Sequence, residues 1–499
     1  MTTFYVTTAI PYVNAAPHLG HALELVQADV LARHRRLRGQ QVRFLTGTDD
    51  NALKNVTAAR AAGVAVQEFV DANAASFRGL REPLALSYDD FIRTGSDPRH
   101  RAGVERLWRQ CAGRGDFYRR RYEGRYCAGC ERFYSPDELV EGRCPEHGVA
   151  PEPVAEVNWF FRLSRYEAAI RDALESGRVR VAPQSRRNEV LAFVRDGLRD
   201  LSVSRPAARA GGWGIQVPDD PEQVVYVWWD ALANYVTALG YGGDDRLYRT
   251  WWRGAEERVH VIGKGILRFH AVYWLALLLA AGQPLPTTIH VHEYLTVDGA
   301  KISKSTGTAV SPYTLADRFG TDALRWWLLR EVGRHGDTDF TVDRLVSRAN
   351  GDLANRVGNL QSRTLALVAR YRQGYVGGGG RATGGADLLG CCRTLPRQVD
   401  EALSRFDFRG ATQAIIDVVD GANRLVDAER PWELARAEAA ADRSAATRFD
   451  EVLSVLVAAC RVVAAELRPF LPHGAAALAA QLELPGSERP TPVFPRLRL

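Results

Sequence analysis

Residues 4–39 read FYVTTAIPYVNAAPHLGHALELVQADVLARHRRLRG, and this stretch indicates the fold. Its first ten residues are rich in strand-forming types and are followed by the loop NAAP. The residues after that loop have helical periodicity up to Gly39, with an apolar side formed by Leu23, Val26, Val30 and Leu37. The next segment, VRFLTGTDD at 42–50, has the pattern of a strand that ends in acids. A strand, a helix and a strand in this order predict a parallel α/β unit with its functional crevice at the carboxyl ends of the strands.

The rest of the chain repeats this pattern in one region and departs from it in two others. Strand-then-helix signals return at 224–236 and 258–279, whereas 117–215 holds short β-like pieces and many charges, as an insertion would. Helical patterns dominate from 345 onward, interrupted by the glycine-rich and therefore flexible segment 376–385. We predict an α/β fold in which a Rossmann-like parallel sheet is split by an insert and followed by an all-helical domain. The expected boundaries are 1–116, 117–215, 216–290, 291–344 and 345–499.

Composition places the chain among soluble globular proteins. Of its 499 residues 46% are apolar and 25% are charged, and the formal net charge is +6. This mild basic excess is compatible with a polyanionic partner and equally with an ordinary solvated surface. The longest apolar run, at 272–282, is too short to span a membrane, and the N-terminus lacks the pattern of a signal peptide. We therefore expect no membrane segment and a cytoplasmic location.

Three cysteines and one histidine inside the insert have metal-ligand spacing. They occur in YCAGC at 126–130 and RCPEH at 143–147, in the pattern C-x2-C-x13-C-x2-H. Each pair can offer two ligands to one tetrahedral zinc ion, whereas a disulfide is the weaker interpretation in a reducing compartment. Because four protein ligands leave no open position, we predict one structural zinc ion bound by Cys127, Cys130, Cys144 and His147.

Lysine is rare in this chain and concentrated in one segment. Lysines and arginines together number 65, but only four are lysines, and two of these lie in KISKS at 301–305. A GC-rich genome explains the arginines but not the exceptions. Lysine is a compact point charge on a flexible stem, so two lysines on a loop can close on the charge of a departing pyrophosphate. Alone, KISKS is weak evidence, because it also fits a solvated loop.

The segment PHLGH at 17–21 lies where the first strand gives way to the helix. His18 and His21 are three residues apart and share a face on a helical turn, and Gly20 leaves room for a flat group beside the backbone. A helix N-terminus also favours anions. Alone, this motif is weak as well, and a helix-capping or surface pair of histidines would explain it.

Taken together and in this order, the two motifs resemble the HIGH and KMSKS signatures of class I aminoacyl-tRNA synthetases. The resemblance covers nearly the whole chain and is closest to the methionyl-tRNA synthetase family, through segments such as FLTGTD, YCAGCERFY, DLSVSRP, YVWWDALANYV and LANRVGNLQSR. It implies that the zinc-binding insert is a connective segment and that 345–499 binds the anticodon. It also implies ATP with Mg²⁺ as a cofactor, phosphate stabilisation by His18, His21, Lys301 and Lys304, and ATP binding by these four residues with Gly20.

The resemblance further implies a binding pocket for L-methionine. Asp49 matches the acid that holds the substrate ammonium group, and aromatic residues match the walls around the thioether. The full set is Ile10, Tyr12, Asp49, Trp228, Ala231, Leu232, Tyr235, Phe269, His270 and Trp274. On pattern alone, such an aromatic cluster would be interpreted as ordinary core.

In the helical region the resemblance implies recognition of tRNA(Met) through its CAU anticodon. Asn359 and Arg363 are four residues apart on one helical face, and Trp432 lies in RPWEL. Single-stranded bases are read by stacking on aromatic rings and by hydrogen bonds to their edges, so these residue types suit the task. The alternative is a core tryptophan and an ordinary surface pair.

Several residues near the expected active site differ from those that the family usually carries: Asn51, Ala52, Gly265, His292 and Thr308. They motivate two alternatives, an adenylating paralogue for another amino acid or acceptor and a tRNA-binding pseudo-synthetase. The retained histidines and lysines argue against the pseudo-synthetase, because only phosphate chemistry obviously requires all four. No C-terminal dimerisation domain of the kind found in some relatives is visible, so we expect a monomer.

Overall fold

The structure is a computed structural model of the chain, and it describes residues 2–127, 132–134, 136–145, 148–302, 310–374, 385–483 and 491–499. The chain divides into two compact units. The α/β unit comprises Met1–Ala28, Arg38–Arg81 and Ser87–His292, and the helical unit comprises Asp29–Leu37, Glu82–Leu86 and Glu293–Leu499. Within the described residues, none of the helices combines the length and the apolar character that crossing a membrane requires.

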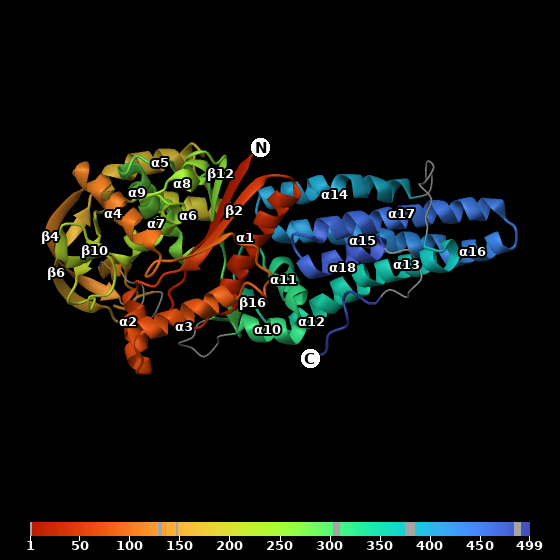
Figure 1. The fold of residues 1–499 in the computed structure, drawn as a ribbon, viewed down its shortest axis with the longest axis horizontal. Coiled ribbons are helices and arrows are strands. Elements are labelled where there is room, and N and C mark those ends of the chain that lie inside the picture. Colours follow the sequence, from red (N-terminus) through yellow and green to blue (C-terminus); the bar gives the residue numbers. More distant parts are fainter. Residues whose placement is uncertain are drawn as a thin grey trace. The chain divides into compact units, whose positions relative to one another are not determined.

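A six-stranded parallel sheet forms the centre of the α/β unit (Figure 1). Its strand order is β3-β2-β1-β12-β13-β7, with β1 Thr3–Thr8, β2 Gln41–Thr48, β3 Asp90–Arg93, β7 Arg180–Ala182, β12 Glu257–Gly263 and β13 Thr288–His292. Val6 on β1 pairs with Phe44 on one side and with Val259 on the other. The strand order therefore reverses between β1 and β12, which is where an open α/β sheet forms its ligand crevice. The predicted parallel α/β fold is confirmed.

The helix and strand expected in the opening stretch are both present. Helix α1 spans Leu19–Leu37, and Leu23, Val26 and Val30 on its predicted apolar side are fully buried. Gly39 follows with a φ of 76°, a conformation that glycine adopts without steric cost. The period of 3.6 residues and the terminal glycine were thus sufficient to locate this element.

The stretch expected to form the insert, 117–215, contains one small sheet, the first strand of a second small sheet and one strand of the main sheet. The first is β5-β4-β6-β8, made of β4 Phe117–Cys127, β5 Arg132–Tyr134, β6 Glu152–Phe161 and β8 Leu201–Ser202. The second is β10-β11-β9, made of β9 Ser204–Pro206, β10 Gln216–Val217 and β11 Asp220–Val225. The strand expected near 224 therefore exists as β11, but it pairs antiparallel with β9. In contrast, the short β7 pairs with β13 at the edge of the parallel sheet.

Helices pack around the sheet over one large apolar core. They are α2 Leu53–Ala62, α3 Val66–Gly79, α4 Pro98–Gly113, α5 Glu167–Glu175, α6 Gln184–Arg195, α7 Val227–Thr237, α8 Arg246–Tyr248 and α9 Trp274–Ala280. A π-helical turn, η5 Phe269–Tyr273, leads directly into α9. Trp108 of α4 and Trp229 of α7 pack edge to face in this core, with ring centroids 5.5 Å apart.

Helices make up most of the helical unit, as expected for the C-terminal part of the chain. They are α10 Pro312–Phe319, α11 Thr321–Arg330, α12 Val342–Arg348, α13 Asn359–Arg372, α14 Ala386–Ser404, α15 Phe408–Glu429, α16 Pro431–Ala439, α17 Arg443–Leu467 and α18 Pro472–Glu483. Helices α14, α15 and α17 run side by side (Figure 1). Asp407 and Asp442 cap α15 and α17 by accepting backbone N–H bonds. The predicted flexible segment falls almost entirely on 375–384, outside the described residues.

The helical unit also contains a three-stranded sheet, two of whose strands precede α10 while the third lies between α11 and α12. Its order is β15-β14-β16, with β14 Leu295–Val297, β15 Ala300–Lys301 and β16 Thr338–Asp339. The β14–β15 hairpin turns at Asp298 and Gly299, which both have positive φ. This hairpin brings the chain to the start of the KISKS segment.

Candidate active site

Two histidines stack at the start of α1, beyond the carboxyl end of β1. His18 directly precedes α1, and His21 lies in its first turn. Their ring centroids are 3.9 Å apart, with an interplanar angle of 26°. The N–H of His18 donates to Nδ1 of His21 and the N–H of Gly20 donates to Nδ1 of His18, both at 3.1 Å. Because Nδ1 accepts in both rings, a neutral ring carries its proton on Nε2, which is then a donor at an anion-favouring helix N-terminus.

The ring of His18 lies close against Gly20. A Cβ at this position would lie 2.9 Å from Cε1 of His18, closer than carbon atoms normally approach. The sequence predicted that a flat group approaches the backbone at Gly20, and in the structure that group is the imidazole of His18. A larger residue would push this ring away from His21.

Aromatic side chains from three segments meet at the carboxyl ends of β1 and β12. Trp228, in the first turn of α7, stacks on Phe269 with centroids 3.7 Å apart and packs edge-on against Tyr12 at 6.1 Å. Tyr235 on the same helix packs against Trp274 at 5.8 Å. Ala231 and Leu232 are buried on α7, and Ile10 packs against the same core. The structure thus brings the predicted apolar and aromatic residues together in one cluster.

His270 is held in this cluster as a neutral ring. Its Nδ1 lies 3.0 Å from the carbonyl oxygen of Ile266, which only accepts, so Nδ1 carries the proton. Nε2 therefore accepts, and the Tyr235 hydroxyl donates to it at 2.7 Å. Burial lowers the pKa of His270 to about 4 and raises the pKa of Tyr235 far above its usual range. Both groups are consequently uncharged near neutral pH.

Asp49 lies at the edge of the same cluster. Its backbone N–H donates to the carbonyl of Pro11 at 2.9 Å, next to Tyr12, and Lys54 lies 5.2 Å from the centroid of the Tyr12 ring. The carboxylate of Asp49 is buried and accepts from the backbone N–H of Asn51 at 3.1 Å. A buried carboxylate beside an aromatic cluster is suited to binding an ammonium group.

Sequence reasoning missed a buried polar chain behind Asp49. The side-chain amide of Asn51 donates to Oδ2 of Asp230 at 2.6 Å, and Oδ1 of Asp230 is hydrogen-bonded to Nε2 of His100. Nδ1 of His100 bonds to the Thr237 hydroxyl at 2.8 Å. An acid next to the tryptophans of WWDAL was the signal available in the sequence, but its partner His100 is 130 residues away.

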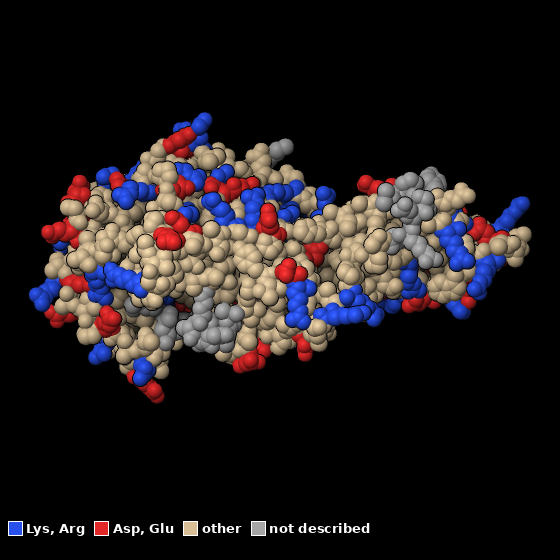
Figure 2. Space-filling view, turned by 60° about the horizontal axis from the view of Figure 1, so that its bottom comes forward, with Lys and Arg blue, Asp and Glu red and all other residues tan. Residues whose placement is uncertain are grey.

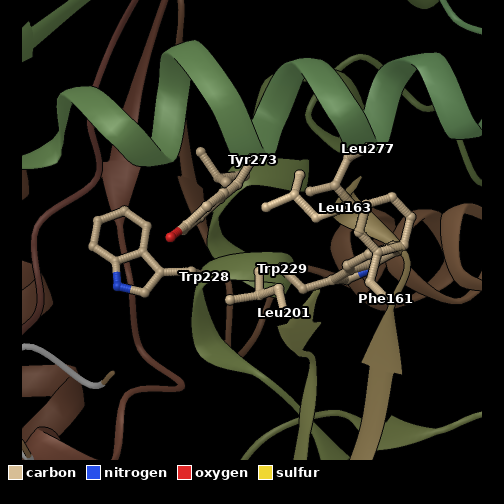
Figure 3. Close-up of a pocket in the computed structure, with 8 residues that line it drawn as sticks. Phe161, Leu163, Leu201, Trp228, Trp229, Tyr273 and Leu277 are labelled. Carbon is tan, nitrogen blue, oxygen red and sulfur yellow. The ribbon is translucent and has the colours of Figure 1, made fainter. Parts of the chain in front are cut away.

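A small apolar hollow lies beside Trp228 (Figure 3). Trp228 and Tyr273 stand at one end of it and Phe161 at the other, with Leu163, Trp229 and Leu277 between. Among the described residues, Nε1 of Trp228 is buried and has no hydrogen-bond partner. Nε1 of Trp229, which lines the same hollow, has no partner among the described residues either, so two buried indole N–H groups border this apolar space.

The structure describes only some of the lysines and of the residues that differ from those the family usually carries. Lys264 begins the short helical turn after β12, followed by Gly265, and His292 at the end of β13 bonds to Glu24 at 3.0 Å. The backbone of Lys301 pairs with Thr296 in the β14–β15 hairpin. Lys304 and Thr308 lie outside the described residues, as does the side chain of Lys301.

Two of the four predicted zinc ligands lie in one small cluster. Cys127 at the end of β4 and Cys144 are both buried and pack with Tyr134. Cys130 and His147 lie outside the described residues. Two buried thiols from the two halves of the motif fit the soft ligands that zinc prefers. The zinc site itself stays a prediction.

In the helical unit, two of the three residues predicted to read the anticodon face each other. Arg363 lies on α13 and Trp432 on α16, with the guanidinium carbon 6.0 Å from the Trp432 ring centroid. Arg363 also pairs with Asp427 of α15 at 3.2 Å. Asn359 is exposed one helical turn earlier, at the start of α13.

Comparisons with known proteins agree with this arrangement. The family described as "tRNA synthetases class I (M)" matches residues 4–151 and 147–365. The methionine–tRNA ligase of Mycobacterium bovis is 40% identical over 99% of this chain and 98% of its own. That of Caldanaerobacter subterraneus is 40% identical over 94% of this chain and 72% of its own. The chain belongs to the methionyl-tRNA synthetase family.

The fold agrees with that of a solved member of the family. Mycobacterium tuberculosis methionyl-tRNA synthetase in complex with methionyl-adenylate superposes with a TM-score of 0.92 at 39% identity. The alignment covers 99% of this chain and 100% of that one. Membership in the methionyl-tRNA synthetase family thus extends over both units, including the helices after β16.

Proposed function

We propose that the protein is a methionine–tRNA ligase, which activates methionine with ATP and transfers it to the 3′ end of tRNA(Met). The observation that carries this proposal is the stacked pair His18–His21 beside the aromatic cluster at the carboxyl ends of β1 and β12, in a chain of the methionyl-tRNA synthetase family. The direct test is charging of a tRNA(Met) transcript with radiolabelled methionine. We expect charging with methionine alone. Charging with another amino acid would contradict the proposal.

In the first step a carboxylate oxygen of methionine attacks the α-phosphorus of ATP. The P–O bond to pyrophosphate breaks, and methionyl-adenylate and pyrophosphate result. No proton has to be removed from the carboxylate, so the residues act through position and charge. Nε2 of His18 and of His21 would donate to phosphate oxygens, and Lys301 and Lys304 would neutralise the departing pyrophosphate. Gly20 keeps the His18 ring in place for this task. Mg²⁺ bound with ATP would supply further charge neutralisation.

Substrate selection is proposed to lie in the aromatic cluster. Asp49 would bind the methionine ammonium group, while the thioether would pack among Tyr12, Trp228 and Phe269. A neutral His270 suits this pocket, because a charged imidazolium would have to be desolvated beside an apolar side chain. Ile10, Ala231, Leu232, Tyr235 and Trp274 would complete the walls.

A structural zinc ion is proposed for the insert, held by Cys127, Cys130, Cys144 and His147. The burial of Cys127 and Cys144 in one cluster supports this set. Thiolate ligands would close the tips of β4 and β5 around the ion, so its role would be to stabilise the insert. The proposed zinc takes no part in the reaction.

The helical unit is proposed to bind the anticodon. Trp432 offers an aromatic face, and Asn359 and Arg363 offer hydrogen bonds to base edges of a CAU anticodon. Arginines on the same run of helices are well exposed, with side-chain exposure of 46% for Arg344 and 43% for Arg356. Figure 2 shows basic side chains gathered along one edge of the helical unit. Such residues suit the phosphate backbone of RNA, whose binding is mainly electrostatic.

Replacing Trp432 separates the two halves of this proposal. In Trp432→Ala, activation of methionine without tRNA is expected to persist, while charging of tRNA(Met) falls by about a hundredfold, as expected when a base loses its stacking partner. Unchanged charging would overturn the anticodon assignment. A tRNA substrate also implies work in the cytoplasm, and we expect a monomer, which sedimentation of the purified protein would test.

A further inference from the structure

A long π-helix precedes the residues proposed to read the anticodon. Helix α12, the π-helix η6 Ala349–Gly358 and helix α13 follow one another without a break, and Asn359 is the first residue after η6. The π-helix is normally seen as a single wide turn inside an α-helix, frequently at a functional site. Here it extends over ten residues. Its geometry sets the rotation of every residue that follows about the helix axis.

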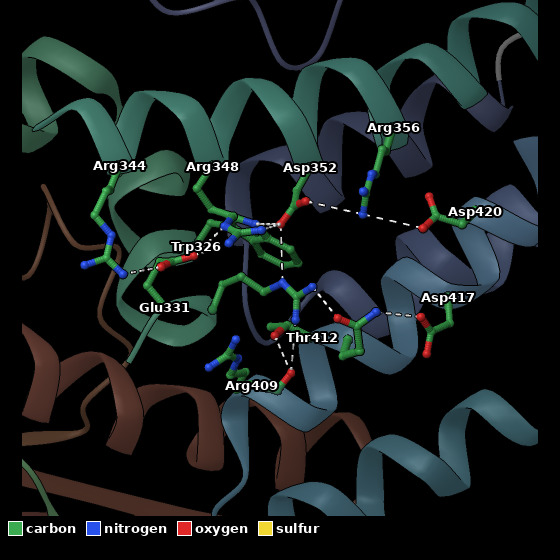
Figure 4. A network of polar contacts seen from close by, with 12 residues as sticks. Trp326, Glu331, Arg344, Arg348, Asp352, Arg356, Arg409, Thr412, Asp417 and Asp420 are labelled. Carbon is green, nitrogen blue, oxygen red and sulfur yellow. Dashed lines mark hydrogen bonds and ion pairs between the residues drawn. The ribbon is translucent and has the colours of Figure 1, made fainter. Parts of the chain in front are cut away.

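A buried carboxylate lies inside η6. Asp352 is 2% exposed and accepts a hydrogen bond from Nε1 of Trp326 at 3.1 Å and from Nε of Arg330 at 3.3 Å, both from α11 (Figure 4). Arg348 and Arg356, four residues before and after it, lie 3.5 Å and 3.6 Å from its oxygens. One carboxylate therefore receives an indole and three guanidinium groups.

The arginines around Asp352 extend these contacts to neighbouring helices. Arg330 donates to the side chain of Gln413 on α15, and Arg356 pairs with Asp420 on α15 at 3.4 Å. Arg348 donates to Glu331 at 2.6 Å at the end of α11. The π-helix is thus tied to α11 on one side and to α15 on the other (Figure 4).

Helix α15 also contacts the residues proposed to bind the anticodon. Arg363 pairs with Asp427 of α15, and Trp432 lies on α16 directly after α15. Asp352 lies only a few residues before Asn359 and Arg363 in the chain. Arginines from η6 and from α13 both pair with carboxylates of α15. A shift of η6 to α-helical hydrogen bonding would turn Asn359 and Arg363 relative to α15 and Trp432.

We propose that Asp352 is a positioning residue for tRNA recognition, which holds the π-helical turns of η6 so that Asn359 and Arg363 face the anticodon beside Trp432. This inference rests on the proposed anticodon role of these three residues. A buried ion pair can often be replaced by apolar side chains without loss of stability, so stability alone does not account for this network. What the charged network adds is one defined geometry for the segment that carries the reading residues.

The first test compares Asp352→Asn with Asp417→Asn, a control that removes an exposed carboxylate of the same network, bonded to Gln413 at 2.5 Å. In Asp352→Asn, methionine-dependent exchange of pyrophosphate into ATP without tRNA is expected to stay within about twofold of the parent, because His18, His21 and the aromatic cluster lie in the α/β unit, whereas Asp352 lies in the helical unit. The kcat/KM for tRNA(Met) is expected to fall about tenfold, mainly through KM, as expected for coupling through a packed network. The control should retain both rates, and an unchanged KM in Asp352→Asn overturns the inference.

A second variant keeps the test valid if Asp352→Asn folds poorly. The double variant Asp352→Leu/Arg330→Met removes both buried charges together, so that neither is left without the other, and only the indole N–H of Trp326 loses a buried acceptor. Its thermal stability is expected to stay closer to the parent than that of Asp352→Asn, yet its preference for a CAU transcript over one with an altered anticodon should fall. A merely structural role predicts a retained preference once stability is restored, and that result also overturns the inference.

The variants Asn359→Ala and Arg363→Ala distinguish the failure of this inference from failure of the proposed function. If both reduce charging and Asp352→Asn does not, the positioning role is wrong and the anticodon site stands. If neither reduces charging, the proposed anticodon site is wrong, and the positioning role falls with it.

Discussion

The hydroxyl of Tyr235 donates to Nε2 of His270 at 2.7 Å, while Nδ1 of the same ring donates to the carbonyl of Ile266 at 3.0 Å. Both ring nitrogens are used by neutral partners inside a fully buried cluster. The ring therefore has one defined tautomer, and among the described residues no carboxylate pairs with it. This arrangement makes the pocket an apolar surface with fixed polar edges, which suits a thioether side chain.

The free energy of unfolding is expected to decrease as the pH is lowered, and part of this decrease comes from His270. Burial lowers its pKa to about 4, and burial also lowers the pKa of His260 well below its usual value. In the unfolded chain these rings take up protons near pH 6.5, so below that pH the unfolded state binds more protons and the free energy of unfolding decreases. For His270 the loss approaches about 3 kcal/mol at pH 4. Urea unfolding at several pH values, for the parent and for His270→Gln, checks this.

The comparison isolates one group among many that titrate. Between pH 6.5 and 4.5 the free energy of unfolding of His270→Gln should decrease less steeply with falling pH than that of the parent. The difference in slope corresponds to the uptake of up to one proton on unfolding. Parallel curves for the two proteins would show that His270 is not held neutral by the fold.

Asn51 is expected to keep two carboxylates apart. Its backbone N–H bonds to Asp49 and its amide bonds to Asp230, so Asn51→Asp places a third negative charge between them. We expect about 2 kcal/mol of lost stability and a raised KM for methionine, because Asp49 would then favour its protonated form. Asn188→Asp, at an exposed position on α6, is the matched control. Equal effects of the two substitutions on the methionine KM would contradict this role.

His21→Ala should slow activation without unfolding the protein. The ring is half-buried, and its proposed contribution is a hydrogen bond that strengthens as charge develops on phosphate. The kcat of pyrophosphate exchange is expected to fall about a hundredfold, with the melting temperature changed little. His335→Ala removes an exposed histidine of the helical unit and should have no effect. A His21 variant with full kcat would remove this residue from the mechanism.

The purified protein should contain one zinc ion per chain, measurable by elemental analysis. Cys144→Ser is expected to lose the metal and to make the β4–β5 region susceptible to protease, because its small cluster contains only a few buried side chains. Cys460→Ser, at a buried cysteine of α17, should retain full zinc content. Zinc-free protein that is folded and protease-resistant would contradict the assignment.

The sequence alone predicted those parts of the fold for which the sequence signal is local and strong. The period of α1, the terminal glycine and the alternation of strands and helices predicted the parallel sheet. The aromatic cluster could not be found in this way, because Tyr12, Trp228 and Phe269 come from distant segments and look like ordinary core. Only the resemblance to a known family selected them.

Other features leave little trace in the sequence. Strand β7 has three residues and no alternation, so nothing local indicates that it pairs with β13. The bond between Asp230 and His100 depends on the packing of α7 on α4, and the π-helical form of η6 depends on partners from α11 and α15. Such long-range polar contacts are fixed by tertiary packing, which periodicity does not encode.

The most direct test of the central claim is exchange of pyrophosphate into ATP by the purified protein against each of the twenty amino acids, without tRNA. The account predicts exchange with methionine and with no other amino acid, because the cluster around Trp228 and the neutral His270 select an unbranched apolar side chain that ends in a thioether. Exchange driven by a different amino acid, or none with any in folded protein, would contradict it.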